Sequence, residues 1–103
     1  MQINWSERSR GDLRDILLYV AEKFGQRTAK EVLAEVRDTI KLLKDFPYIG
    51  TSFVRDEGVG IEYFSFSSRQ NMIVYFVEGE AVNIVAIWQN RQDVGRLIKE
   101  LER

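Results

Sequence analysis

The chain has 103 residues, 45% of them hydrophobic, a net charge of −1, and neither cysteine nor histidine. This length suits one domain, residues 1–103. The missing residue types exclude a disulfide framework and a thiolate metal site, and remove the commonest metal ligand. We therefore expect no metal and no other cofactor.

The distribution of charge bears on the choice of partner. Residues 51–93 carry three arginines, Arg55, Arg69 and Arg91, against six acidic residues, a net charge of −3. A surface that grips a phosphate backbone normally carries more cations than this. Direct nucleic-acid binding by the chain alone is therefore not expected.

Two features predict the compartment. The sequence has no apolar run of about 18 residues, and its N-terminus lacks the basic-then-apolar order of a signal peptide. We expect a soluble cytoplasmic protein without membrane contact.

The first 46 residues predict one strand and two helices. Apolar residues at positions 3 and 5 alternate as in a short strand, which ends at Ser6, a favourable N-cap. Apolar residues at helical spacing then predict a helix that ends at Gly25. Thr28 and Glu31 have the spacing of a capping box and predict the start of a second helix, which ends before Pro47. So short a gap favours an antiparallel helical hairpin. The charged residues on the opposite faces are interpreted as solvent-exposed: Arg14, Asp15, Glu22, Lys30, Glu35, Arg37 and Lys41.

The second half predicts a sheet. Residues 47–60 are interpreted as an irregular link, and strands are predicted from residue 61 to 66, 72 to 77 and 81 to 88. The middle run is continuously apolar, which is typical of a strand buried on both faces. A short amphipathic helix over 94–101 closes the chain. The predicted fold is α+β: a small antiparallel sheet with an N-terminal helical hairpin packed on it, in the order β-α-α-β-β-β-α.

Motifs spread over nearly the whole chain carry a family resemblance. They are Trp5-Ser6 leading into Asp12-Leu13, the Phe46-Pro47-x-x-Gly50 turn, Arg55 followed by Gly58-x-Gly60, Ile73-Val74-Tyr75, and Arg91-Gln92-Asp93. In this order they resemble toxins of the RelE/ParE superfamily of bacterial type II toxin–antitoxin systems, and are closer to the ParE branch. The resemblance implies a sheet with a helical hairpin on one side and a cognate antitoxin as partner.

The two branches imply different targets. RelE-like toxins cleave messenger RNA in the ribosome, whereas the ParE branch is associated with inhibition of DNA gyrase without catalysis. RNA cleavage needs a base, an acid and a cation. Here Met72 stands where the RelE pattern typically has an arginine, and no tyrosine or histidine follows Tyr75. Arg55, Arg69 and Arg91 remain as weak nuclease candidates, so we favour the ParE-like interpretation and a protein that is not an enzyme.

Six residues are candidates for contact with the target or the antitoxin: Arg91, Trp88, Arg69, Tyr63, Phe64 and Phe66. Loop positions on a rigid scaffold often bind partners, and aromatic residues dominate interface hot spots. Each has a structural alternative. Arg91 could pair with Asp93, Arg69 could sit in a solvated turn, and Trp88 could lie in the core. The three aromatic residues of 63–66 require either one outward-facing ring or a bulge.

Three functions therefore remain open. The first is a ParE-like toxin that inhibits gyrase by protein–protein contact and is neutralised by its antitoxin. The others are a RelE-like ribosome-dependent endonuclease and a non-toxic paralogue that only binds an antitoxin. In each case we expect a partner helix in a groove beside the hairpin and a partner strand on the sheet. The acidic sheet half would suit a partner tail rich in lysine and arginine.

Overall fold

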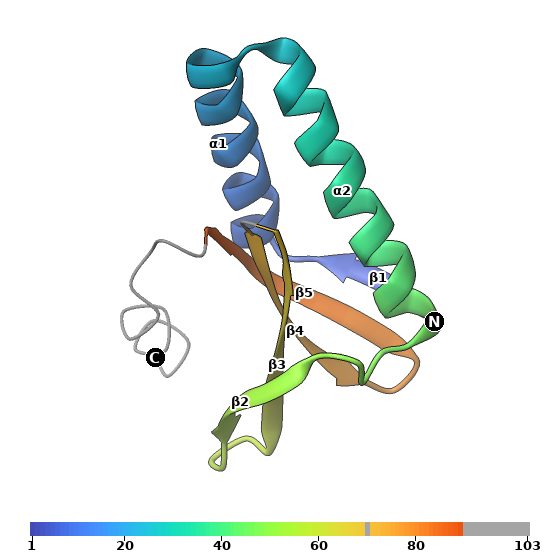
Figure 1. Cartoon of the computed structure of the whole chain (residues 1–103). Helices are drawn as coiled ribbons and strands as arrows, with labels where there is room; N and C mark the ends of the chain where they lie inside the picture. Colours follow the sequence, from blue (N-terminus) through green and yellow to red (C-terminus); the bar gives the residue numbers. More distant parts are fainter. Residues whose placement is uncertain (70, 90–103) are drawn as a thin grey trace.

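A helical hairpin and a five-stranded sheet form the part of the chain that the computed structural model describes, residues 1–69 and 71–89 (Figure 1). The predicted α+β architecture is confirmed. The elements in chain order are β1 (Gln2–Trp5), α1 (Glu7–Phe24), α2 (Gln26–Asp45), β2 (Thr51–Asp56), β3 (Ile61–Ser68), β4 (Asn71–Glu78) and β5 (Ala81–Gln89). The helix predicted over 94–101 lies outside the described residues.

The ends of α1 follow the sequence signals. The Ser6 side chain accepts a hydrogen bond from the Ser9 amide at 3.0 Å, so Ser6 is the N-cap. Gly25 ends α1 with a φ of 95°, a conformation that costs glycine little. No helix in the described ranges is both long and apolar enough to span a membrane.

The predicted capping box at Thr28 is wrong. Gly25 ends α1 and is also the N-cap of α2, so the second helix starts at Gln26. Thr28 therefore lies inside α2, where its hydroxyl donates to the Phe24 carbonyl at 3.2 Å. A single residue, Gly25, joins the two helices, and from it they diverge toward the sheet (Figure 1).

The sheet has the order β1-β5-β4-β3-β2 and is mixed, because β1 pairs with β5 in parallel while the other pairs are antiparallel. The three predicted strands of the second half are β3, β4 and β5. The interpretation of 47–60 as an irregular link is wrong in its middle, where β2 forms the outer edge of the sheet. A register shift between Ser52 and Val54 interrupts this strand.

The main core lies between the hairpin and one face of the sheet. It contains Ile16 and Val20 of α1, Val36 and Leu43 of α2, and sheet residues such as Tyr75. A smaller cluster covers the other face of the sheet: Met72, Val74, Ala86 and Trp88. β4 thus contributes side chains to both clusters, as its continuous apolar run predicts.

Polar contacts tie the hairpin and the loop after it to the sheet. The Tyr75 hydroxyl accepts a hydrogen bond from the Gly50 amide at 2.9 Å, which ties the loop after α2 to β4. Burial raises the pKa of Tyr75. On the other helix, the Asp12 carboxylate accepts from the Ile87 amide at 3.0 Å, which ties α1 to β5.

Candidate functional site

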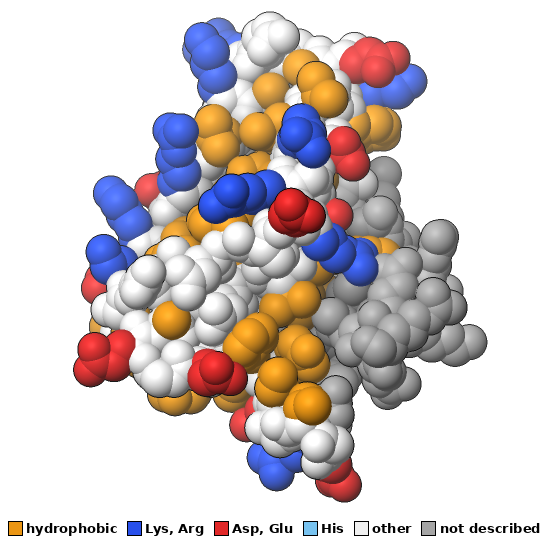
Figure 2. Space-filling view, turned by 180° about the vertical axis from the view of Figure 1, so that it is seen from behind, with side chains coloured by type: hydrophobic (Ala, Val, Ile, Leu, Met, Phe, Trp, Pro, Cys, Tyr) orange, Lys and Arg blue, Asp and Glu red, His pale blue; other side chains and the backbone are white. Residues whose placement is uncertain are grey.

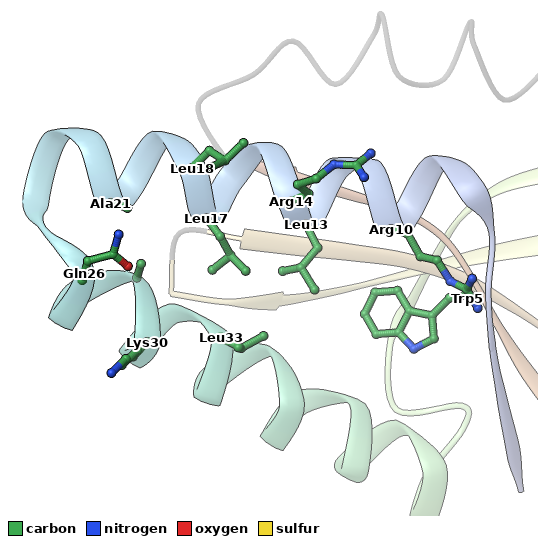
Figure 3. A pocket seen from close by; sticks show the side chains of 11 residues that line it. Trp5, Arg10, Leu13, Arg14, Leu17, Leu18, Ala21, Gln26, Lys30 and Leu33 are labelled. Atoms are coloured by element: carbon green, nitrogen blue, oxygen red, sulfur yellow. The ribbon is translucent and has the colours of Figure 1, made fainter.

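An apolar groove of about 610 Å³ runs between α1 and α2. Figure 3 shows Leu13 and Leu17 pointing from α1 into the space between the helices, with Trp5 at the β1 end. Ala29 and Leu33 of α2 line the opposite wall. On each helix these side chains recur at helical spacing on the face toward the other helix. Because the two helices diverge, their side chains do not fill the space between them.

The groove is open because part of the hairpin extends beyond the sheet (Figure 1). Several large apolar side chains on α1 are consequently exposed, among them Leu18 at 63% and Phe24 at 66%. Hydrophobic side chains also reach the surface over the helices in the view from behind, with lysine and arginine beside them (Figure 2). Apolar surface of this kind on a small protein indicates a binding site for another molecule.

Cations border the groove. Arg10, Arg14 and Lys30 are exposed and line it, and none of the groove-lining residues is acidic. The sequence interpretation placed Arg14 and Lys30 on simple solvated faces; they are exposed as expected, but they also border an apolar site. Helical periodicity could not reveal this, because it identifies the face toward the core and not a gap between two helices.

The three aromatic candidates of β3 lie on opposite faces of the sheet. Phe64 and Phe66 pack against the main core, whereas Tyr63 packs against the smaller cluster. Phe64 also stacks on Tyr75, with ring centroids 5.6 Å apart. The side chains of β3 therefore alternate regularly between the two faces of the sheet, and all three aromatic rings are partly buried. None of them is a fully exposed anchor.

Trp88 is buried at 7% exposure, which agrees with its interpretation as core. The guanidinium of Arg8 lies 5.4 Å from the centre of its ring, in a cation–π arrangement. Arg8 also pairs with Asp12, whose carboxylate oxygen lies 3.6 Å from the Arg8 Nε. Burial raises the pKa of Asp12, although the Ile87 amide and Arg8 act in the opposite direction.

The candidate arginines do not converge in the described ranges. Arg55 lies on β2 and pairs with Glu62, near the start of β3, at 3.4 Å. Arg69 follows the other end of β3, roughly 23 Å along the strand, since a strand rises about 3.3 Å per residue. Arg91 lies outside the described residues. A hydrogen bond from Ser52 and the nearby Arg55 lower the pKa of Glu62.

Arg69 sits in the turn between β3 and β4 with a φ of 48°, an uncommon conformation for a residue with a side chain. Its Nε lies 3.5 Å from a carboxylate oxygen of Glu35 on α2, and its side chain is 82% exposed. The other oxygen of Glu35 accepts from the Ser68 hydroxyl at 2.7 Å. This turn is therefore fixed to α2 and presents Arg69 at the surface. Among the described residues, no group of three or more acidic side chains is arranged to hold a metal ion.

Comparisons with known proteins identify a family and a similar fold. A family model described as "ParE toxin of type II toxin-antitoxin system, parDE" matches residues 3–94. The fold is similar to that of a solved chain from a chromosomal ParDE toxin–antitoxin system of P. aeruginosa. That similarity has a TM-score of 0.66 at 19% identity and covers 86% of this chain and 95% of the other. None of the curated proteins compared with the chain matches it.

Proposed function

This chain belongs to the ParE toxin family of type II toxin–antitoxin systems, and we propose that it inhibits DNA gyrase by protein–protein contact until a cognate antitoxin binds it. The proposal places the antitoxin in the groove between α1 and α2. It places the site of action in the cytoplasm, where gyrase works.

The groove is the observation that carries antitoxin binding. Its wall on α1 runs from Arg10 to Ala21, roughly 16 Å at about 1.5 Å per helical residue. An amphipathic helix of about three turns has the same length and can place an apolar stripe in such a groove. Leu13, Leu17 and Leu33 offer this stripe the apolar contacts that dominate helix-in-groove binding.

The bordering charges define the partner helix further. With Arg10, Arg14 and Lys30 at the groove, acidic residues beside the apolar stripe are complementary, and basic ones are repelled. The acidic sheet half suggests a partner tail rich in lysine and arginine. Such a tail would therefore contact the sheet and not this groove. Within residues 1–69 and 71–89, β2 is an outer strand that pairs with β3 alone, so it offers an edge for an added partner strand.

Three observations support inhibition without catalysis. The chain has no histidine, and Arg55 and Arg69 lie at opposite ends of β3. Tyr75 is fully buried, and its hydroxyl is bonded to Gly50, so it is placed to support the fold and not to transfer protons to a substrate. A concerted acid–base cleavage of RNA requires such groups at one place.

A supercoiling assay tests the target. Purified protein should block the introduction of negative supercoils into a relaxed plasmid by gyrase, or trap cleaved DNA, and preincubation with the co-encoded antitoxin should restore activity. Gyrase that is unaffected at excess protein would contradict the proposal. Messenger cleavage in a translating extract, abolished by Arg69→Ala, would instead identify a ribosome-dependent nuclease.

An expression test addresses toxicity itself. Production of the protein without the antitoxin should arrest growth with a DNA-damage response, and co-expression of the antitoxin should relieve both. Normal growth at full protein level would identify a paralogue that binds an antitoxin but is not toxic.

A further inference from the structure

A row of cations extends along α2 beyond the groove. Arg37, Lys41 and Lys44 follow Lys30 at intervals of seven, four and three residues, and all four are exposed. Helical residues at these intervals share one face. Figure 2 shows a row of lysine and arginine side chains down its left edge, on the side of α2. Lys30 also lines the groove, so this α2 cation row continues one edge of the groove.

The α2 cation row is available to a partner. In residues 1–69 and 71–89, ion pairs are formed by Arg8, Arg55 and Arg69, and none by a member of the row. Like charges three or four residues apart destabilise a helix, as between Lys41 and its neighbours in the row. An acidic partner removes this repulsion and displaces no existing ion pair of the row.

The row ends at an apolar turn. Directly after α2, Phe46 and Tyr48 are 59% and 64% exposed and border a hollow of about 380 Å³. The Tyr48 ring packs edge-on against Phe64 with centroids 5.8 Å apart, and the Ile49 amide donates to the Phe46 carbonyl at 3.2 Å. The turn is therefore held in place while its apolar side chains face solvent. Exposed aromatic residues in such a setting are typical anchors for a partner.

The width of the row decides which acidic partner fits. Each of three cations in the row is followed in sequence by an acidic residue, about 100° further round the helix. These acidic residues are Glu31, Asp38 and Asp45. A nucleic-acid duplex, or a second helix about 10–12 Å across, would cover the acidic residues as well as the cations. An extended peptide needs only about 5 Å, so it can contact the cations alone.

The length of the row sets the length of this peptide. Lys44 lies fourteen residues after Lys30, so the row is about 21 Å long at about 1.5 Å per helical residue. An extended chain covers this distance with about six residues, at about 3.3 Å each. A chain already bound in the groove would reach the row as an intramolecular step, because Lys30 belongs to both sites.

We propose that a second segment of the antitoxin, acidic, extended and about six residues long, lies along the α2 cation row and ends with an apolar side chain against Phe46 and Tyr48. This inference rests on the proposed binding of the antitoxin helix in the groove. The two segments are held by different forces: burial of apolar surface holds the helix, and charge holds the extended segment.

Charge reversal in the row provides the test. Isothermal titration with the co-encoded antitoxin should show affinity about tenfold or more below wild type for the double variant Arg37→Glu/Lys41→Glu at about 0.1 M salt. The difference should nearly vanish at about 1 M salt, where the screening length falls from about 10 Å to about 3 Å. Both positions are exposed and glutamate is a good helix former, so the fold is retained.

Arg27→Glu is the matched control for this charge reversal. Arg27 is another exposed cation of α2, but it neither lines the groove nor belongs to the row. Its reversal should change the affinity by less than about twofold. Wild-type affinity of the double variant at about 0.1 M salt would overturn the inference, and so would an equal loss in the control.

The apolar end of the segment is tested by Phe46→Ser. This variant should bind the antitoxin about fivefold or more weakly at both salt concentrations, because the lost contact is apolar. Phe24→Ser is its control, since Phe24 is 66% exposed at the end of α1 and does not line the groove. An equal loss of affinity in both variants would contradict an anchor at the turn.

Two further results separate this inference from the proposed function and from nucleic-acid binding. A loss of affinity in Leu17→Asp but not in Arg37→Glu/Lys41→Glu would retain the groove and overturn the second segment. Failure of the gyrase assay would leave the antitoxin titrations unaffected. A random-sequence DNA duplex should not bind at about 0.1 M salt. Duplex binding that the double variant abolishes would identify a phosphate-backbone surface instead and overturn the inference.

Discussion

Two faces of α2 differ in what they offer a ligand. Lys30 and Leu33 border a groove of about 610 Å³ that is apolar and cationic at its edge. Glu31 and Glu35 border a cavity of about 190 Å³ that is polar and net negative. Residues adjacent in sequence thus serve sites of opposite charge, because successive helical residues point about 100° apart. The near-neutral total charge of the chain conceals this separation.

The largest expected effect comes from placing a charge in the groove. Leu17→Asp should weaken antitoxin binding by roughly 30- to 1,000-fold, about 2–4 kcal/mol, because it removes apolar contact and desolvates a carboxylate. Isothermal titration against the antitoxin measures this. Leu17→Met, which conserves volume, should bind nearly normally. Undiminished antitoxin binding by Leu17→Asp would contradict the groove as the binding site.

A smaller effect is expected where the loop after α2 is fixed to the sheet. A methyl group at Gly50 would lie 2.6 Å from the Tyr75 hydroxyl and 2.8 Å from the Ser65 carbonyl oxygen. Gly50→Ala should therefore lower the free energy of unfolding by about 2 kcal/mol in urea denaturation. Gly11→Ala is the matched control, since its methyl group meets only the Arg14 guanidinium at 3.6 Å and removes a helix-weakening glycine. It should stabilise by up to about 1 kcal/mol. Equal stability of the two variants would contradict the close packing at Gly50.

The smallest effects concern Asp12, which fixes α1 to β5. Asp12→Ala leaves the Ile87 amide without its acceptor and should destabilise by about 1–2 kcal/mol, whereas Asp12→Asn retains an acceptor and should cost less.

The two Asp12 variants also differ from the wild type in pH dependence. The folded-state pKa of Asp12 is raised above 3.8, so the folded state binds the proton more tightly than the unfolded state does. The contribution of Asp12 to stability should therefore rise as the pH falls through the folded pKa toward 3.8, and Asp12→Asn should lack it. Thermal unfolding between pH 7 and 4 measures the difference, and an opposite slope would show that the Arg8 ion pair outweighs burial.

Sequence reasoning succeeded where the signals are local. Ser6 and Gly25 delimit α1 as predicted, and the apolar run of β4 is buried on both faces. The sequence did not predict β2, which is an edge strand with a register shift. Its short run of residues between glycines shows little alternation of apolar and polar side chains. Sequence reasoning misplaced the start of α2 because Gly25 serves both helices, which a capping motif at Thr28 does not reveal. The parallel β1–β5 pairing and the groove between α1 and α2 depend on contacts distant in the chain.

The groove between α1 and α2 is the surface where we expect the antitoxin to bind. Titration of labelled protein with the antitoxin, followed by backbone and methyl NMR shifts, tests it most directly. The largest changes are expected at Leu13, Leu17 and Leu33. Added salt should weaken the affinity, because it screens the charges of Arg10, Arg14 and Lys30. Changes confined to the sheet, with these leucine methyl groups unaffected at saturation, would contradict it.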